Sequence, residues 1–310
     1  HDLILHHYPS SPFSEKVRLM MGLKGLVWHS VLIPSVMPKP DVVALTGGYR
    51  KTPLLQIGAD IYCDSALIAD VLEHREPEPA LFPAHARGLS RVVAQWADST
   101  LFWAAMAHNL SPRGAAALFA GQPPEVAQAF AADRAAMRQN MTQLRPADAT
   151  SAYRSHLRRL ANMLDDQPFL MGELPGIADL AAYHPLWFSR VVNPTMAGIL
   201  DATPDVIEWM DRVAAIGHGR AQRMASADAV GIAHAATPEP IKADEVFQDD
   251  HGIALGSRVT VAAEAFGTET SEGILRAATR TRYTIERTDD RAGMVHVHFI
   301  VQNAAPWPGS

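Results

Sequence analysis

The chain has 310 residues, a formal net charge of −6 and 48% hydrophobic residues. This length suggests two or three domains with ordinary cores, and the acidic balance argues against general affinity for nucleic acid. Its single cysteine, Cys63, excludes an internal disulfide and fits a reducing, cytoplasmic location. No segment resembles a signal peptide, and the most apolar helical stretch, residues 92–110, is interrupted by Gln95, Asp98 and His108, so we expect no membrane partner.

The first predicted elements are a short strand at residues 3–5 and a helix that follows a hydroxyl-rich turn. Ser11 suits the N-cap of this helix and Pro12 its first position. Apolar residues then recur at helical spacing from Phe13 onward. The positive end of a helix dipole favours an anion and lowers the pKa of a thiol placed there.

The next 50 residues predict alternating strands and helices. A strand at 27–33 precedes a proline-rich loop at 34–40 and a short helix at 41–45. Residues 51–58 then indicate a turn, a proline and a buried strand. A turn at Ala59-Asp60 leads to a last short strand at 61–63, and Asp64-Ser65 opens a helix at 66–74.

A proline-rich linker at 76–79 separates this region from an alanine-rich helical one, residues 85 to about 229. Within it, the segment Leu170 to Leu180 reads Leu-Met-Gly-Glu-Leu-Pro-Gly-Ile-Ala-Asp-Leu. Asp179 is placed to hydrogen-bond the first backbone N–H groups of a helix. A second linker follows at 237–240, Thr-Pro-Glu-Pro.

The last 65 or so residues change character. Alternating strands are predicted at 259–261, 283–285 and 295–301, with turns at Gly267, Gly273 and Asp289-Asp290. We expect a small antiparallel sheet or barrel that forms a discrete unit. Its apolar residues either face the body or close a core of their own; they are Val259, Val261, Ile285, Val295, Val297 and Phe299.

Together, the Ser-Pro-Phe turn with its Lys16-Val17-Arg18 continuation, the Pro53 strand, the Asp64-Ser65 helix start and the Pro175 to Asp179 box resemble the glutathione transferases. The resemblance covers roughly residues 1 to 230. It implies an α/β thioredoxin-like N-terminal domain (1–78), an all-helical second domain (85–232) and, beyond the family pattern, a small antiparallel β domain (244–304).

By this resemblance, Ser11 holds the position at which a hydroxyl or thiol meets the sulfur of glutathione. Ser10 and Tyr8 are the neighbouring alternatives. A serine there would stabilise the cofactor's thiolate by a hydrogen bond without forming a covalent bond itself. The other interpretation is that Ser11 serves only as an N-cap.

The resemblance also implies a glutathione-binding set. Pro53 matches a cis-proline, so that Thr52 would pair with the cysteinyl backbone of the tripeptide. Asp64 and Ser65 would hold the γ-glutamyl end, and Lys51 would reach the glycyl carboxylate. The Asp64-Ser65 pair suits a plain helix cap as well.

Other polar residues are assigned no chemistry. Cys63 is interpreted as a small buried residue. His296 and His298 share one strand face, but no carboxylate or cysteine stands at ligand spacing, so we expect a solvated face and no metal. The arginines of the last segment are offset by nearby carboxylates, which gives no case for nucleic-acid binding.

The function predicted is a glutathione-dependent transferase that conjugates or isomerises a small electrophile, bound against Phe102, Trp103 and Met106. The alternative is a non-catalytic binding or scaffold protein of the same fold. The resemblance further implies a homodimer.

Overall fold

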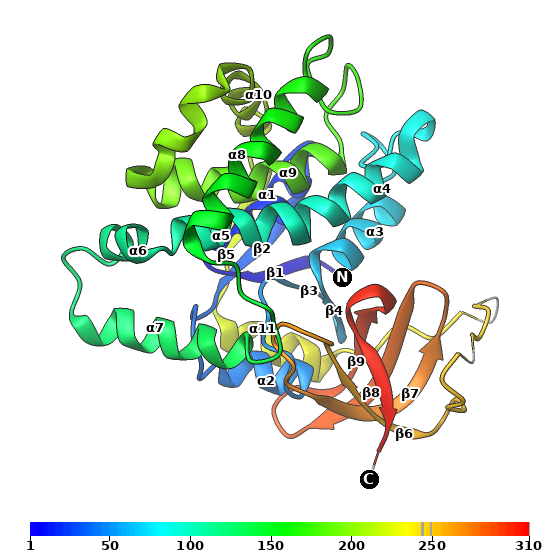
Figure 1. Ribbon diagram of the computed structural model, residues 1–310. Coiled ribbons are helices and arrows are strands. Elements are labelled where there is room, and N and C mark those ends of the chain that lie inside the picture. Colours follow the sequence, from blue (N-terminus) through cyan, green and yellow to red (C-terminus); the bar gives the residue numbers. More distant parts are fainter. Residues whose placement is uncertain (243–244, 249, 310) are drawn as a thin grey trace.

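The computed structural model describes residues 1–242, 245–248 and 250–309. Asp244, the expected first residue of the third domain, lies outside the described residues. The chain forms three parts: an N-terminal α/β domain, a helical domain above it, and a β-rich C-terminal extension at its side (Figure 1). We use "the extension" for residues 258–309. Among the described residues, no helix has the length and apolar character needed to cross a bilayer.

The N-terminal domain follows the predicted β-α-β-α-β-β-α order. The turn and proline signals give its boundaries, and the Pro12 and Pro40 helices both begin at a proline. Its elements are β1 (Leu3–His7), α1 (Pro12–Leu23), β2 (Val27–Leu32), α2 (Pro40–Thr46), β3 (Leu54–Ile57), β4 (Asp60–Cys63) and α3 (Ser65–Arg75).

In the helical domain, Asp179 makes the helix-capping interaction that was expected. Its carboxylate accepts hydrogen bonds from the backbone N–H groups of Gly176 (3.0 Å) and Leu170 (2.8 Å). After the short helix η1 (Ala84–Ala86), its elements are α4 (Arg87–Trp96), η2 (Ala97–Leu101), α5 (Phe102–Asn109), α6 (Pro112–Leu118), α7 (Pro124–Met137), α8 (Pro146–Met163), α9 (Ile177–Trp187), η3 (Phe188–Val192), η4 (Pro194–Ala202) and α10 (Pro204–Ala214).

After α10 the chain returns to the N-terminal domain. There β5 (Arg220–Arg223), which the sequence analysis did not predict, pairs in parallel with β2, and α11 (Ser226–Ala235) packs beside α2. The extension then consists of β6 (Arg258–Ala262), β7 (Ser271–Ala278), β8 (Arg282–Asp289), β9 (Gly293–Ile300), η5 (Val301–Asn303) and β10 (Ala305–Pro308). Its strands pair antiparallel with one another, as expected. The turn expected at Gly273 is wrong, because Gly273 lies within β7 and pairs with Val259.

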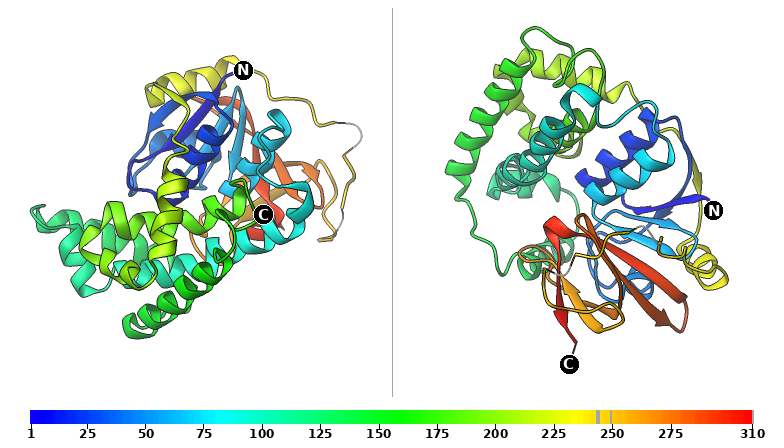
Figure 2. Two further views of the ribbon diagram at one scale, coloured as in Figure 1. Left: turned by 90° about the horizontal axis from the view of Figure 1, so that it is seen from above. Right: turned by 90° about the vertical axis from the view of Figure 1, so that its right-hand side faces the viewer.

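The expectation of a discrete extension is wrong. Strand β9 pairs in parallel with β4, so that one sheet runs through both parts in the order β10-β6-β7-β8-β9-β4-β3-β1-β2-β5. Figure 2 shows the extension and the helical domain packed against different parts of the N-terminal domain. The sequence did not reveal this pairing because strand periodicity identifies a buried face but not the strand that pairs beside it.

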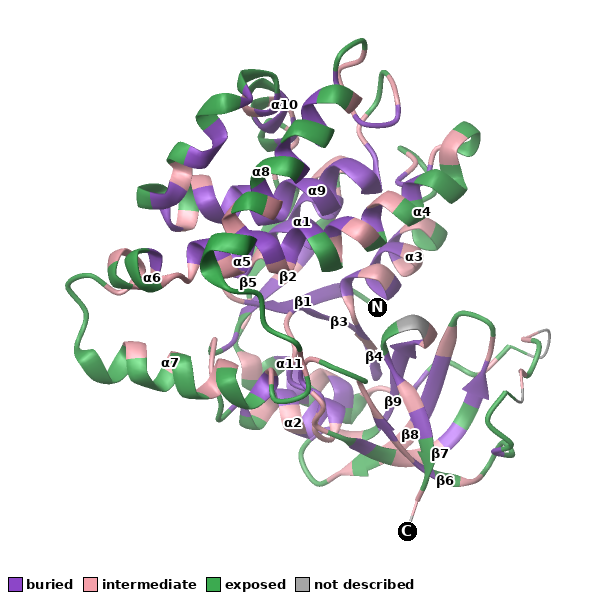
Figure 3. Cartoon of the chain, viewed as in Figure 1, coloured by how far each residue is buried: buried purple, intermediate pink, exposed green. Residues whose placement is uncertain are grey.

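Two cores lie on opposite faces of the sheet. One face is covered by α1, α3 and the helical domain. The other packs against α2 and α11, and all six apolar residues singled out in the extension join it, together with Ile4, Leu45 and Leu54. Figure 3 shows buried residues continuing from the N-terminal strands into β8 and β9. The extension therefore completes the core of the first domain rather than closing its own.

Candidate functional site

Three of the segments singled out in the sequence meet at one end of the sheet. His6 of β1 pairs with Leu54 of β3, and Leu54 pairs with Cys63 of β4. The turn after β1, the segment before β3 and the residues after β4 consequently lie next to one another. Residues 10–11, 52–53 and 64–65 are thus brought to one edge.

Ser11 is the N-cap of α1. Its Oγ accepts a hydrogen bond from the backbone N–H of Ser14 at 3.2 Å, as the N-cap interpretation predicts. Because the oxygen acts as the acceptor there, the hydroxyl proton remains available for a further partner. Ser11 is only 2% exposed, whereas Ser10 is exposed.

Two arginine side chains donate hydrogen bonds to Tyr8, one to its hydroxyl and one to its carbonyl. A guanidinium N–H of Arg134, from α7, donates to its hydroxyl oxygen at 3.1 Å. The Arg18 guanidinium donates to the carbonyls of Tyr8 (3.3 Å) and Pro9 (3.1 Å), and so fixes the turn. Of the three candidate residues, Ser11 is the N-cap at the positive end of the α1 dipole.

The peptide bond between Thr52 and Pro53 is cis, as predicted. The Lys39 ammonium donates to Thr52 Oγ1 at 3.2 Å and to the Arg50 carbonyl at 3.1 Å. Burial lowers the pKa of Lys39 to about 8, and the positive charge of Arg134 adds to this effect. Lys39 was not predicted from the sequence, because it lies in a loop without a periodic pattern.

Asp64 and Ser65 begin α3. Asp64 has a left-handed backbone (φ 83°), unusual for a residue other than glycine, and its Oδ1 accepts from the Ala66 N–H at 2.8 Å. The Ser65 hydroxyl oxygen accepts from the Lys16 ammonium at 3.1 Å. The cap function expected of Asp64 is therefore present.

A buried charge network links this position to the helical domain. Lys16, which is 1% exposed, also donates to Asp98 Oδ2 at 2.6 Å, and His184 Nε2 lies 2.9 Å from Asp98 Oδ1. Burial raises the pKa of Asp98, but Lys16 and His184 outweigh this and lower it overall. Burial lowers the pKa of His184. The network fixes Ser65 relative to both domains.

The extension reaches over this edge of the sheet from two sides. Asn303 donates its side-chain N–H to Asp64 Oδ2 at 2.7 Å. In the loop between β6 and β7, Gly267 passes so close to Lys51 that an added Cβ would lie 3.0 Å from Lys51 Cγ, and its φ of +64° suits glycine. Next to it, the Phe266 ring packs edge-on against Trp103 of α5, with centroids 4.9 Å apart.

The same loop joins a salt-bridge cluster. Arg50 contacts Asp133 of α7 and Glu269 of the extension, both at 2.5 Å, and is itself buried. The Lys51 ammonium lies 5.3 Å from the centre of the Tyr49 ring, and burial lowers the pKa of Lys51. All three parts of the molecule thus meet around residues 49–52.

Comparison with known proteins identifies the fold. The profile of the glutathione S-transferase N-terminal domain matches residues 5–80, and that of the C-terminal domain matches residues 125–212. A crystal structure of a GST-like protein from Pseudomonas syringae is 40% identical, covers 99% of both chains and has a TM-score of 0.83. The chain belongs to the glutathione S-transferase family. Because that relative matches over nearly the whole length, the extension is shared with it.

Two further similar proteins cover a smaller share of this chain. A glutathione S-transferase from Methylobacterium radiotolerans, solved in complex with glutathione sulfonate, is 20% identical, with a TM-score of 0.50 over 72% of this chain and 97% of that one. FtsZ-localized protein A of Caulobacter vibrioides is 26% identical over 184 residues, which are 57% of this chain and 73% of that protein.

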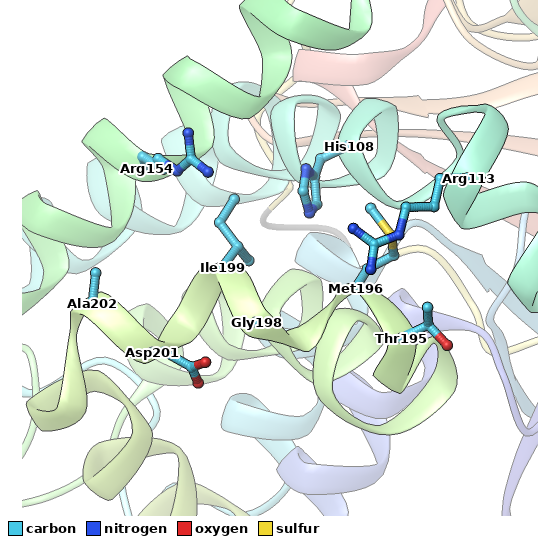
Figure 4. Close-up of a pocket in the computed structure, with 9 residues that line it drawn as sticks. All are labelled: His108, Arg113, Arg154, Thr195, Met196, Gly198, Ile199, Asp201 and Ala202. Carbon is cyan, nitrogen blue, oxygen red and sulfur yellow. The ribbon is translucent and has the colours of Figure 1, made fainter.

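A pocket of about 420 Å³ lies elsewhere in this glutathione S-transferase fold, between α5, α6, α8 and η4 (Figure 4). The two arginines that line it, Arg113 and Arg154, are exposed, and the lining also contains one carboxylate, that of Asp201. We assign it no role. The residues that line it are His108, Arg113, Arg154, Thr195, Met196, Gly198, Ile199, Asp201 and Ala202.

Proposed function

We propose that this protein is a glutathione-dependent transferase, in which the Ser11 hydroxyl stabilises the thiolate of bound glutathione. The observation that carries the proposal is the meeting of the capped α1 N-terminus, the cis-Pro53 segment and the Asp64-Ser65 helix start at one sheet edge. Membership of the glutathione S-transferase family supports it.

The chemistry required of Ser11 is modest. A free thiol has a pKa near ~8.5, so that only a small fraction is thiolate at neutral pH. A hydroxyl that donates to the sulfur favours the charged form, and the N-terminus of α1 adds a positive potential. The thiolate would then attack an electrophilic carbon, or assist an isomerisation by adding and leaving again.

The tripeptide would lie along the same edge. The backbone of Thr52 would pair with its cysteinyl residue, as an added strand does. The Ser65 hydroxyl and the N-terminus of α3 suit the γ-glutamyl carboxylate, and Asp64 its amino group. Lys51, with Lys39 beside Thr52, suits the glycyl carboxylate.

The electrophile would bind against Trp103, which lies between the helical domain and Phe266 of the extension. Phe102 and Met106, also expected there, are buried in the core and serve packing. We further propose that the protein acts as a homodimer in the cytoplasm.

Two measurements on the full-length protein test this function. Calorimetry with glutathione should show saturable binding, and a conjugation assay with 1-chloro-2,4-dinitrobenzene should show turnover above the uncatalysed rate. Binding that is lost in Asp64→Ala but kept in Ser10→Ala would assign the γ-glutamyl end. Absence of glutathione binding at millimolar concentration would overturn the proposal.

A second candidate is a non-catalytic binding protein. The observation that favours it is that the extension already contacts Asp64, Lys51 and Trp103, while Ser11 is 2% exposed. Similarity to FtsZ-localized protein A is compatible with it. Retention on glutathione resin without conjugation of any of several electrophile classes would favour this function. Replacing residues 263–269 by a short Gly-Ser linker should leave conjugation absent if this candidate is correct, and should raise it if the loop merely obstructs an enzyme.

A further inference from the structure

The junction between β4 and β9 brings together three metal-ligating side chains from distant parts of the chain. Asp60 pairs with His296, and Tyr62 pairs with His298. Residues two apart on a strand share a face, so that both imidazoles and the Asp60 carboxylate project from the same side of the sheet. The sequence offered His296 and His298 without a carboxylate; the parallel pairing with β4 supplies one.

These groups are close together and buried. His298 Nε2 lies 2.8 Å from Asp60 Oδ1, and His296 Nδ1 lies 3.8 Å from the same oxygen. One ligand atom from each residue lies within 4.8 Å of the others. Asp60 is 2%, His296 6% and His298 3% exposed, so the expected solvated face is wrong.

Surrounding hydrogen bonds orient two of the three groups. His298 Nδ1 lies 2.8 Å from the Thr284 hydroxyl, which fixes the ring and can accept a hydrogen bond from Nδ1–H when Nε2 binds a cation. The backbone N–H of Glu239, in the linker before the extension, donates to Asp60 Oδ2 at 2.8 Å and leaves Oδ1 toward the histidines. Such outer contacts are typical of metal ligands.

His296 supplies the observation that points to a ligand. Its Nδ1 is buried and has no hydrogen-bond partner among the described residues. Its other nitrogen, Nε2, lies 3.6 Å from Glu286 Oε2. A buried polar atom without a partner is costly, and a cation placed between Nδ1, His298 Nε2 and Asp60 Oδ1 would remove this cost.

We propose that Asp60, His296 and His298 form a binding site for a divalent transition metal ion of the zinc class. Two imidazoles and one carboxylate are a common zinc ligand set, and a four-coordinate ion leaves one position for water. An ion at this junction fastens the extension to β4 through Asp60, four residues before Asp64. The competing explanation is a metal-free His-Asp hydrogen bond that joins the same two strands.

Metal stoichiometry tests the proposal directly. The full-length protein without an affinity tag is stripped with EDTA, incubated with zinc chloride, passed through a desalting column and analysed by elemental mass spectrometry. Wild type should retain one zinc ion per chain. His296→Gln should lose it and still fold, since Nδ1 makes no hydrogen bond that the substitution would remove. His74→Gln, an exposed histidine on α3, is the matched control and should retain the ion.

Cobalt(II) gives a second readout. Bound in a site with two imidazoles, it should produce a visible absorption spectrum in wild type and His74→Gln, and none in His296→Gln or Asp60→Asn. Zinc should raise the melting temperature of wild type and leave that of His296→Gln unchanged. Failure of wild type to retain zinc, or equal retention by His296→Gln, would overturn the proposal. None of these readouts depends on glutathione.

Discussion

The two ends of the sheet make an instructive comparison. In the N-terminal domain, β1, β3 and β4 present one face to α1, α3 and the helical domain, and the other to α2 and α11. In the extension, β6–β9 share the second core. On the opposite face, where β9 adjoins β4, lie the polar side chains of Asp60, His296 and His298, and the backbone of Glu239 donates to Asp60. One end of the sheet is thus covered by the helical domain, whereas at the other end polar contacts join β4, β9 and the linker.

The two ends also differ in how far apart in the sequence their interacting residues lie. The candidate site of the N-terminal domain is built from turns and caps that lie within short segments. The extension contacts that site through residue pairs more than 150 positions apart, such as Asn303 with Asp64 and Phe266 with Trp103.

The largest effect is expected from deleting the extension. A chain that ends at Ala236 would expose Leu54 and Ile61 and leave the edge of β4 without a partner strand. We expect inclusion bodies, or a soluble chain without a cooperative thermal transition, by expression analysis and calorimetry.

A point substitution provides the control for that deletion. In the full-length chain, Phe299→Ala should lower the free energy of unfolding by about 3–5 kcal/mol in a single transition, because its ring is 2% exposed in the shared core. A soluble truncated protein with a cooperative transition, or a separate second transition in Phe299→Ala, would restore the discrete extension.

Ser11→Ala tests the N-terminal end. Loss of one hydrogen bond to a thiolate is worth roughly 1.5–3 kcal/mol, so conjugation should slow by about tenfold to a hundredfold, and the pKa of bound glutathione should rise. Ultraviolet titration of the thiolate measures the second effect. Ser10→Ala and Tyr8→Phe are the matched comparisons, and unchanged activity of Ser11→Ala at every pH would remove Ser11 from the mechanism.

Lys39 predicts a pH dependence. Its pKa of about 8 means that it loses its charge as the pH rises from 7 to 9. If it binds the glycyl carboxylate, affinity for S-methylglutathione, which has no thiol to titrate, should fall by about several-fold between pH 8 and 9. Lys39→Arg keeps its charge and should show a flatter profile by calorimetry. Parallel profiles of the two proteins would argue against this role.

The smallest effect is expected at Asn303. Asn303→Ala frees Asp64 Oδ2, which the amino group of glutathione would otherwise share with the amide. A hydrogen bond of about 1 kcal/mol corresponds to about a fivefold gain in affinity. Fluorescence titration with glutathione measures it; weaker binding would mean instead that Asn303 orients the carboxylate for the ligand.

The sequence predicted the N-terminal domain well because Ser11-Pro12, Thr52-Pro53 and Asp64-Ser65 each determine a local backbone feature. It predicted β6, β8 and β9 of the extension from alternation at Val259, Tyr283 and Val295. It missed β5 and β10, whose four residues each are too short for a periodic signal, and it missed β7, where Gly273 favoured a turn.

The missing parts of the site share a different cause. Lys39 and Asn303 contact the site through their side chains and lie outside the α-helices and strands. No sequence pattern predicts that they contact Thr52 and Asp64. The carboxylate partner of His298 is 238 positions away, and only the β4–β9 pairing brings it near.

The two edge strands of this long sheet, β10 and β5, also affect the tendency of the protein to aggregate. Every sheet edge invites another chain to add a strand, which leads toward aggregation. At one end, two of the four residues of β10, Pro306 and Pro308, have no N–H to offer a newcomer. At the other end, β5 carries the exposed charges of Arg220 and Arg223. Both ends of the sheet are thereby poor templates for further growth.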